Sequence, residues 1–183
     1  MVDLINYIKH INIKPETYLY CFLAALLLSK FLAFYRKYFK VSNKHKWHRQ
    51  TASKVLNRIR QFETSVQKER YIQKMSPFAF EDLILTAYKN NGYKIKRNKR
   101  KTGDGGIDGM VYLSKQWKLI QAKRYDKAYI RFKDIEEFNK ICYAKKKKGL
   151  FIFVGKISEI TIKKAQGCER VTLVYGDKLT KLM

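Results

Sequence analysis

An apolar stretch from Thr17 to Tyr35 constrains this chain more than any other feature of its sequence. Its single charge, Lys30, lies near the C-terminal end, where a lysine stem can reach a membrane interface. About 20 helical residues, at ~1.5 Å each, cross a hydrocarbon layer of ~30 Å. The sequence therefore predicts a transmembrane helix over residues 17–39, preceded by a short segment of residues 1–16. A buried or interfacial helix is the alternative, because Lys30 interrupts the stretch.

The charges on either side of this stretch differ. Before it, Lys9 and Lys14 are offset by Asp3 and Glu16. After it come the basic residues Arg36, Lys37, Lys40, Lys44, Lys46 and Arg49. By the positive-inside rule we expect a single-pass protein of the inner (cytoplasmic) membrane, with its C-terminal part in the cytoplasm. A cleavable signal peptide fits poorly, because its basic residues would precede the apolar core.

The composition is strongly basic, with 40 Lys and Arg against 15 Asp and Glu and a net charge of +25. The excess is present both before and after residue 75, so it is not confined to a tail. Such a charge favours a polyanionic partner, either nucleic acid or an anionic membrane surface. The three cysteines are scattered, and their spacing predicts neither a disulfide framework nor a metal site.

Residues 40–75 form a basic connector. Val55, Ile59, Phe62 and Val66 recur at the spacing of one helical face, and the residues around them are mostly Lys, Arg, Gln and Glu. One interpretation is a helix that packs on the following domain or pairs with a second copy. The other is a surface that follows anionic lipid or DNA.

Residues 76–183 have the pattern of an α/β domain. Ser76 and Pro77 are typical of a helix start, and Asn91–Gly92 of a helix stop, with Phe80, Leu83, Ile84 and Ala87 on one face between them. We expect strands at 93–96, 107–113, 117–123, 149–155 and 171–176, helices at 131–147 and 158–167, and a helical turn at 177–183. This order predicts a mixed β-sheet flanked by helices on both faces.

Three polar residues converge in this pattern. Asp108 follows two glycines at a strand start, and Gln121 and Lys123 are two apart on the next strand, so their side chains point to one side. If the two strands pair through a turn centred on Lys115, position 108 lies opposite about position 122. Asp108 can then approach both polar side chains.

These groups suit the hydrolysis of a phosphodiester bond. A carboxylate and a second oxygen ligand hold Mg²⁺ or Mn²⁺, and a neighbouring lysine can stabilise the charge of the transition state. Gln121 offers a neutral amide oxygen, so a further acidic ligand becomes valuable, and Glu81 on the first helix of the domain is the candidate. The alternative for Asp108 is a cap of a Gly-rich turn, and for Glu81 a favourable charge near a helix start.

Three segments in order, FEDLILTAYKNNGY, GDGGIDG and KLIQAKRY, resemble the catalytic domain of Mrr-like restriction endonucleases, which belong to the PD-(D/E)XK nuclease superfamily. The resemblance covers residues 76–183 and implies a restriction-endonuclease-like fold. It also implies that Asp108 and Gln121 hold the metal, that Lys123 is the catalytic lysine, and that Glu81 is the helix-1 glutamate. Gly105 and Gly106 then form the turn that delivers Asp108. Enzymes of this superfamily often act as dimers, so a homodimer is a further implication.

Several cations surround these positions. We expect contacts to the DNA backbone from Lys96, Arg97, Lys99, Arg100, Lys101 and Arg124. The lysine run at 145–148 is interpreted as the solvated end of a helix. Together these features predict a metal-dependent DNA endonuclease tethered to the cytoplasmic face of a membrane. A catalytically inactive DNA-binding module that tethers DNA to the membrane is one alternative, and a protein whose basic charge meets lipid is another.

Overall fold

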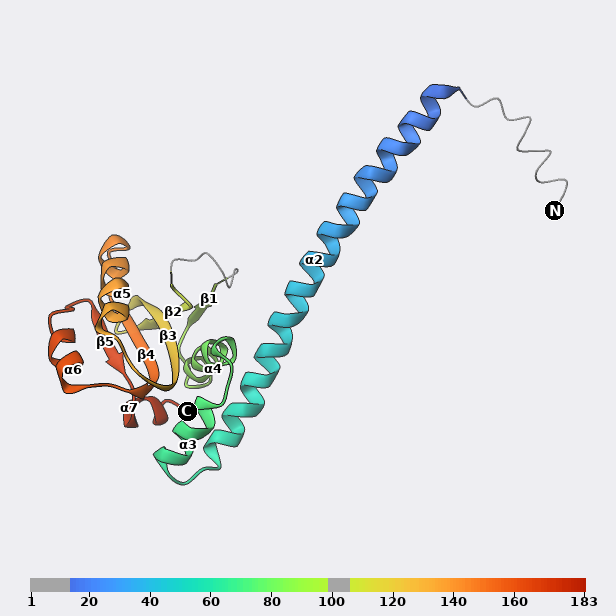
Figure 1. The fold of residues 1–183 in the computed structure, drawn as a ribbon. Coiled ribbons are helices and arrows are strands. Elements are labelled where there is room, and N and C mark those ends of the chain that lie inside the picture. Colours follow the sequence, from blue (N-terminus) through green and yellow to red (C-terminus); the bar gives the residue numbers. More distant parts are fainter. Residues whose placement is uncertain (1–13, 99–105) are drawn as a thin grey trace. The chain divides into compact units, whose positions relative to one another are not determined.

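The structure, a computed structural model, describes residues 14–98 and 106–183, without the side chains of residues 15, 37–50, 126 and 127 (Figure 1). The chain divides into two compact units, Met1–Lys46 and Trp47–Met183. Helix α2 (Pro15–Arg60) runs through the boundary between them.

In the first unit, α2 carries an apolar section from Glu16 to Arg36 with a mean hydropathy of 1.7, none of it buried. Its large apolar side chains are exposed on all sides, with Leu27 and Phe34 each 69% accessible. The Ser29 hydroxyl donates to the Leu26 carbonyl at 2.8 Å, which satisfies a polar group within the apolar surface. By length and composition alone this is a candidate membrane span, a test that signal sequences also meet.

In the second unit, the end of α2 packs through Ala52, Leu56 and Ile59, all of which are buried. Helix α3 (Ser65–Gln73) then begins at a capping box, in which Thr64 accepts from the Gln67 N–H. The prediction of one continuous helical face through Phe62 and Val66 is therefore wrong. The capping box starts a new helix, so Phe62 lies in the turn, and Val66 is 58% exposed.

The end of α2 and α3 share a core with the domain that follows. Leu56, Ile59 and Ile72 belong to the same cluster of buried residues as Phe80 and Ile120. Of the interpretations of the connector, packing on the domain is confirmed, and the second compact unit, Trp47–Met183, contains both parts.

The sheet has the order β1-β2-β3-β4-β5. Its strands are β1 (Ile95–Arg97), β2 (Gly109–Leu113), β3 (Gln116–Tyr129), β4 (Gly149–Lys156) and β5 (Val171–Val174). The pairs β1–β2 and β2–β3 are antiparallel, and β3–β4 and β4–β5 are parallel. This mixed sheet confirms the predicted fold class, because a parallel pair requires a crossover and helices connect β3 to β4 and β4 to β5.

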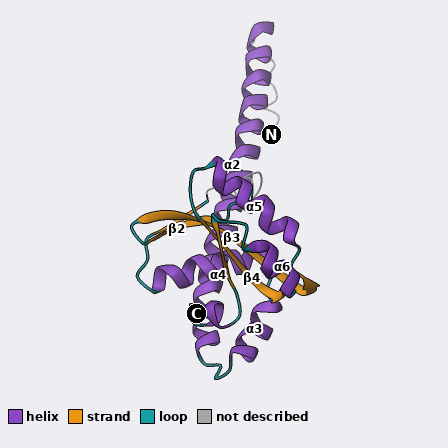
Figure 2. Ribbon diagram, turned by 90° about the vertical axis from the view of Figure 1, so that its left-hand side faces the viewer, coloured by secondary structure: helices purple, strands orange, loops and turns teal. Residues whose placement is uncertain are grey.

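Helices cover both faces of the sheet (Figure 2). The remaining helices are α4 (Pro77–Asn90), α5 (Phe132–Ala144), α6 (Glu159–Ala165) and α7 (Asp177–Thr180). On one face, α4 buries Phe80, Leu83, Ile84 and Ala87, the four predicted residues, each 0% exposed. On the other face, α5 and α6 pack on a second cluster centred on Phe138, Phe151 and Phe153.

A two-residue turn joins β2 to β3. Ser114 and Lys115 both have positive φ, 51° and 61°, and Leu113 pairs with Gln116. This is the geometry of a tight hairpin whose twist suits the flanking strands. Since Gly109 pairs with Ile120, the register continues with Asp108 opposite Gln121. The predicted partner, position 122, is off by one residue because the turn has two central residues rather than three.

Candidate active site

Asp108 lies directly before β2. Its main-chain N–H and its side-chain carboxylate are both hydrogen-bonded to β3. Its N–H donates to the Ile120 carbonyl at 2.8 Å, and its Oδ2 accepts from the Ala122 N–H at 2.6 Å. The carboxylate thus takes a main-chain donor of β3. Because Ala122 stands between Gln121 and Lys123, Asp108 approaches that pair, as the sequence predicted.

Gln121 lies against the glycine turn that precedes Asp108. Gly106 has φ +79°, and a Cβ built there would be 2.9 Å from Gln121 Nε2 and 3.7 Å from Ile141 Cδ1. A side chain at position 106 would therefore be strained and would displace the Gln121 amide. The turn is also tied to β1, since the Asn98 side chain donates to the Ile107 carbonyl. Gly105 lies outside the described residues.

The Gln121 amide oxygen is buried and has no hydrogen-bond partner among the residues that the structure describes. A buried acceptor without a donor is costly, and a bound cation or water would satisfy it. Together with the Asp108 carboxylate it offers the hard oxygen ligands that Mg²⁺ and Mn²⁺ prefer. Within residues 14–98 and 106–183, no three His, Cys, Asp or Glu side chains gather in one place. The donor set that fits a divalent metal here is the Asp108 carboxylate with the Gln121 amide oxygen.

Lys123 reaches towards the start of α5. Its side chain is 38% exposed, and its Nζ is 3.9 Å from Asp134 Oδ1. Asp134 is only 5% exposed, and it also accepts from Tyr125 Oη at 2.7 Å and from Arg131 Nε and Nη2 at 3.0 and 2.9 Å. The polar ends of Lys123, Tyr125 and Arg131 therefore meet at this carboxylate.

Burial acts to raise the pKa of Asp134, but the hydrogen bonds from Arg131 and Tyr125, with the charge of Lys123, hold it below its ordinary value. Burial, together with Asp134, raises the pKa of the Tyr125 phenol. At neutral pH this group therefore consists of an ionised carboxylate and an un-ionised phenol. It presents Lys123 with a fixed negative charge.

Glu81 lies on α4, on the other face of the sheet. It is one helical turn before Leu85 on the same side of the helix, and Leu85 Cδ2 would be 2.8 Å from a Cβ on Gly109. Glu81 is partly buried. Its role as a metal ligand stays a prediction.

The predicted DNA-contacting cations have different surroundings. Arg97 Nη1 is 2.7 Å from Asp82 Oδ1, and its Nη2 donates to Thr86 Oγ1 at 2.8 Å, which joins β1 to α4. Arg124 donates to the Gln73 carbonyl at 2.6 Å. In this structure both guanidinium groups therefore hold elements of the fold together. Lys99, Arg100 and Lys101 lie outside the described residues.

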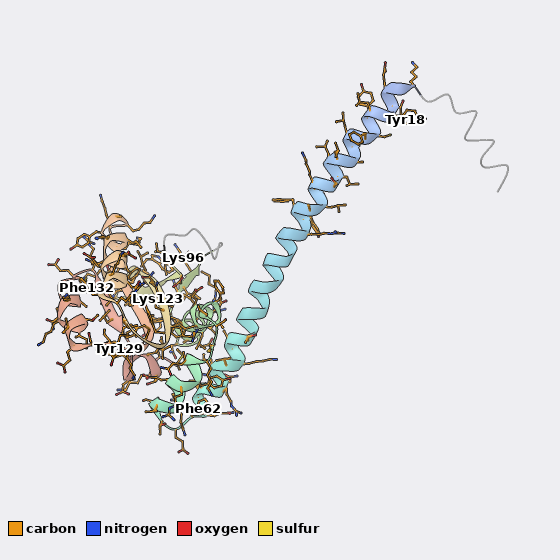
Figure 3. All side chains as sticks on the ribbon, viewed as in Figure 1. Tyr18, Phe62, Lys96, Lys123, Tyr129 and Phe132 are labelled. Carbon is orange, nitrogen blue, oxygen red and sulfur yellow. The ribbon has the colours of Figure 1, made fainter. Side chains whose placement is uncertain are left out.

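Lys96 is exposed, and its Nζ is 4.4 Å from the centre of the Trp117 ring. Figure 3 labels Lys96 and Lys123, which come from β1 and β3. Among the cations expected to contact DNA that the structure describes, Lys96 is the one with an exposed side chain. Its role in DNA binding stays a prediction.

Sequence reasoning missed Asp134, Tyr125 and Asn98. Arg131 and Asp134 have the i, i+3 spacing of a helical ion pair, which was the available signal. That spacing does not reveal that Asp134 is buried beside Lys123, because the contact depends on how α5 follows β3. Asn98 acts through its position at the end of β1, which no local pattern indicates.

Residues 72–183 match the family model Mrr_cat, described as restriction endonuclease. This match covers more than half of the chain, and the chain belongs to the restriction endonuclease family. The suspected kinship with Mrr-like enzymes is thus confirmed.

One relative is the type IV methyl-directed restriction enzyme EcoKMrr of Escherichia coli (strain K12), 32% identical over 116 residues. The aligned region covers 60% of this chain and 38% of that enzyme. Among solved structures, the MspJI restriction endonuclease in complex with a 27-mer oligonucleotide has a TM-score of 0.45 at 20% identity, covering 63% of this chain and 29% of that chain. SfsA of Pyrococcus furiosus in complex with Ca²⁺ has a TM-score of 0.35 at 17% identity, covering 53% and 54%.

Proposed function

We propose that this protein is a metal-dependent DNA endonuclease tethered to the cytoplasmic face of a membrane. The observation that carries the proposal is the hydrogen bond from the Ala122 N–H to the Asp108 carboxylate. It brings Asp108 beside Gln121 and Lys123 in a domain of the restriction endonuclease family with a net charge of +25 on the chain. Such a charge attracts DNA by releasing its counterions.

Asp108 and Gln121 would hold the metal, with Glu81 as a further ligand. A bound Mg²⁺ or Mn²⁺ supplies Lewis-acid polarisation of a phosphoryl oxygen and lowers the pKa of a bound water. The chain's own contribution is the positioning of these oxygens. The Ala122 N–H fixes the Asp108 carboxylate, and Gly106 leaves room for the Gln121 amide.

Lys123 would place its ammonium group against the phosphate, where negative charge grows in the transition state. The carboxylate of Asp134 restricts where that ammonium group can lie. Fixing a charged group before the reaction lowers the reorganisation that the reaction requires. Asp134 is therefore proposed as a positioning residue that acts through Lys123.

The apolar section of α2, Glu16–Arg36, would cross the membrane, with the domain on the side favoured by the basic residues after it. Carbonate extraction of membranes and protease protection of terminal tags test this part. The protein should stay in the membrane pellet, and a C-terminal tag should be cleaved only when the cytoplasmic side is accessible. Release by carbonate would contradict a spanning helix.

Cleavage is tested with the full chain in lipid nanodiscs, supercoiled plasmid DNA and 5 mM Mg²⁺ or Mn²⁺ at about physiological salt. The wild-type protein should nick or linearise the plasmid, and EDTA should stop the reaction. The Lys123→Ala variant should lose at least about 10²-fold in rate while DNA binding persists. The matched control is Lys118→Ala, since Lys118 lies on the same strand and its side chain alternates to the opposite face.

Full activity of Lys123→Ala would refute the assignment of the site. Salt-sensitive DNA binding without cleavage under either metal would favour the alternative, an inactive nuclease fold that tethers DNA. The replacement of a second carboxylate by Gln121 is the feature that makes this alternative worth testing. Binding to anionic lipid without affinity for DNA would support neither.

A further inference from the structure

The face of the sheet that carries Gln121 and Lys123 extends along the β2–β3 hairpin. Side chains alternate along a strand, so Trp117 points to the same side as Gln121, and Met110 and Tyr112 of β2, which pair with Leu119 and Trp117, point to that side as well. Met110 packs against the cluster beneath α5, which identifies this side as the α5 face. The active-site residues and the hairpin aromatics therefore leave the same side of the sheet, with Met110 and the buried Leu119 between them.

On this side of the sheet, the cluster beneath α5 reaches Leu119 of β3 and Met110 of β2. Helix α5 packs on β4 and β5, whereas α4, on the opposite face, is the helix that packs closely against β1 and β2. In Figure 2, β2 extends to the left of the sheet while α5 and α6 lie to the right. Tyr112 is 38% exposed, Trp117 is half-buried and Lys96 is exposed. We call Lys96, Tyr112 and Trp117 the aromatic face.

The chemistry of the aromatic face is specific. The rings of Tyr112 and Trp117 are 5.5 Å apart in an edge-to-face arrangement, and Lys96 Nζ lies 4.4 Å from the Trp117 ring centre. From Gly109 to Leu113 and from Gln116 to Tyr125 there is no acidic residue. Partly exposed rings beside a lysine, on strand segments without an acidic residue, suit a polyanion that also offers flat apolar surfaces.

A nucleic acid strand with unpaired bases has both properties. The faces of bases in a duplex are stacked on each other and are not available to aromatic rings, whereas unpaired bases stack on such rings while cations contact the phosphates. Tyr112 is four residues along β2 from Asp108, roughly 13 Å at ~3.3 Å per residue. Nucleotides close to a phosphate at Asp108 can therefore reach the aromatic face.

We propose that the aromatic face binds unpaired nucleotides next to the scissile phosphate, so that the preferred substrates are DNA molecules with single-stranded segments, such as gaps, flaps or branches. This inference rests on the proposed function for its catalytic part. The binding part does not depend on cleavage and can be measured separately.

The test uses the full chain in nanodiscs and two substrates of the same sequence, a continuous duplex and a duplex with a short single-stranded gap. Trp117→Ala and Tyr112→Ala should each raise KM for the gapped substrate about tenfold, because each removes one stacking partner. Cleavage of the continuous duplex should change less than twofold. Trp117→Phe keeps a stacking ring and should restore most of the affinity.

The matched control is Tyr143→Ala. Tyr143 lies on α5, is 46% exposed, and has the Arg170 guanidinium 4.5 Å from its ring centre, so it is an aromatic–cation pair away from the aromatic face. The Tyr143→Ala variant should have unchanged KM values for both the gapped and the continuous substrate. Circular dichroism of every variant shows whether it is folded, and Lys96→Gln, a surface change, replaces any variant that is not.

Binding is followed separately by fluorescence anisotropy of a labelled single strand in EDTA, where no cleavage takes place. Weaker binding by Trp117→Ala, but not by Tyr143→Ala, supports the aromatic face even if the wild-type protein cleaves nothing, in which case only the proposed function fails. Equal changes in KM for gapped and continuous DNA, or no change in single-strand affinity, would overturn the inference.

Discussion

The two faces of strand β3 differ in what they contribute. On one face, Ile120 is fully buried and Ala122 packs at the margin of the core beneath α4. On the other, Gln121, Lys123 and Tyr125 alternate with them and face the glycine turn and α5. A single strand thus supports the fold with one set of residues and the candidate chemistry with the other.

The difference follows from the two-residue period of a strand. A polar residue can stand between two buried ones without entering their core, because its side chain leaves from the opposite side. We therefore expect substitutions on the two faces of β3 to have different effects. Those on the face of Gln121 and Lys123 should lower activity, and those on the face of Ile120 should lower stability.

The largest effect is expected from Asp108→Asn, beside the polar face of β3 that carries Gln121 and Lys123. An asparagine side-chain oxygen can still accept from the Ala122 N–H, so the local fold should persist, while the charge that attracts a metal is lost. The rate of plasmid cleavage should fall by about 10³-fold, or ~4 kcal/mol. The loss of metal binding is measured by isothermal titration with Mn²⁺. Retained cleavage would remove Asp108 from the site.

The next effect is expected from Ile120→Ala on the apolar face. Ile120 is 0% exposed, and replacing a buried isoleucine by alanine costs about 2–5 kcal/mol of unfolding free energy. The urea midpoint of the full chain in nanodiscs should fall accordingly, as followed by tryptophan fluorescence. Cleavage per folded molecule should change little at low temperature. A loss of catalysis larger than the loss of folded protein would show that the faces are not separable.

The elements of the domain were largely predictable because they depend on local patterns. The face of Phe80, Leu83, Ile84 and Ala87 and the helix start at Ser76 follow from spacing and capping. The break before α3 was missed because apolar residues happen to keep helical spacing across it. The hairpin register was off by one because Ser114 and Lys115 adopt positive φ without the usual glycine or asparagine.

The candidate site was predictable in part for the same reason. Asp108 lies directly before β2, and Gln121 and Lys123 lie on β3, so the short-range pairing of one hairpin suffices to bring them together. Asp134 lies on α5, the helix of the crossover between the parallel strands β3 and β4, and β3 extends past Lys123 with a register shift after Arg124. Contacts made by such a crossover depend on tertiary packing rather than on spacing.

The smallest effect is expected from Asp134→Asn. It tests whether the position of Lys123, on the polar face of β3, depends on the packing of α5. Loss of the Asp134 charge weakens its ion pairs with Lys123 and Arg131. Because both cations are exposed enough to be solvated, the unfolding free energy should fall by about 1–3 kcal/mol at pH 7. Because Lys123 loses its fixed partner, kcat should fall about tenfold while the KM for DNA stays the same. Lys140→Gln, at an exposed helical pair, is the control and should change neither.

The pH dependence separates this role from a general loss of packing. The pKa of Asp134 is lower in the folded protein than its ordinary value, so its contribution to stability is full above about pH 5 and declines as the pH falls below about 4. The difference in urea midpoint between wild type and Asp134→Asn should therefore be constant from pH 5 to 7 and narrow in more acidic buffer. Ile120→Ala has no titrating group, and its difference should persist at low pH. If the difference in urea midpoint between wild type and Asp134→Asn also persists at low pH, Asp134 acts through its shape and not through its charge. The proposal that its charge positions Lys123 would then be wrong.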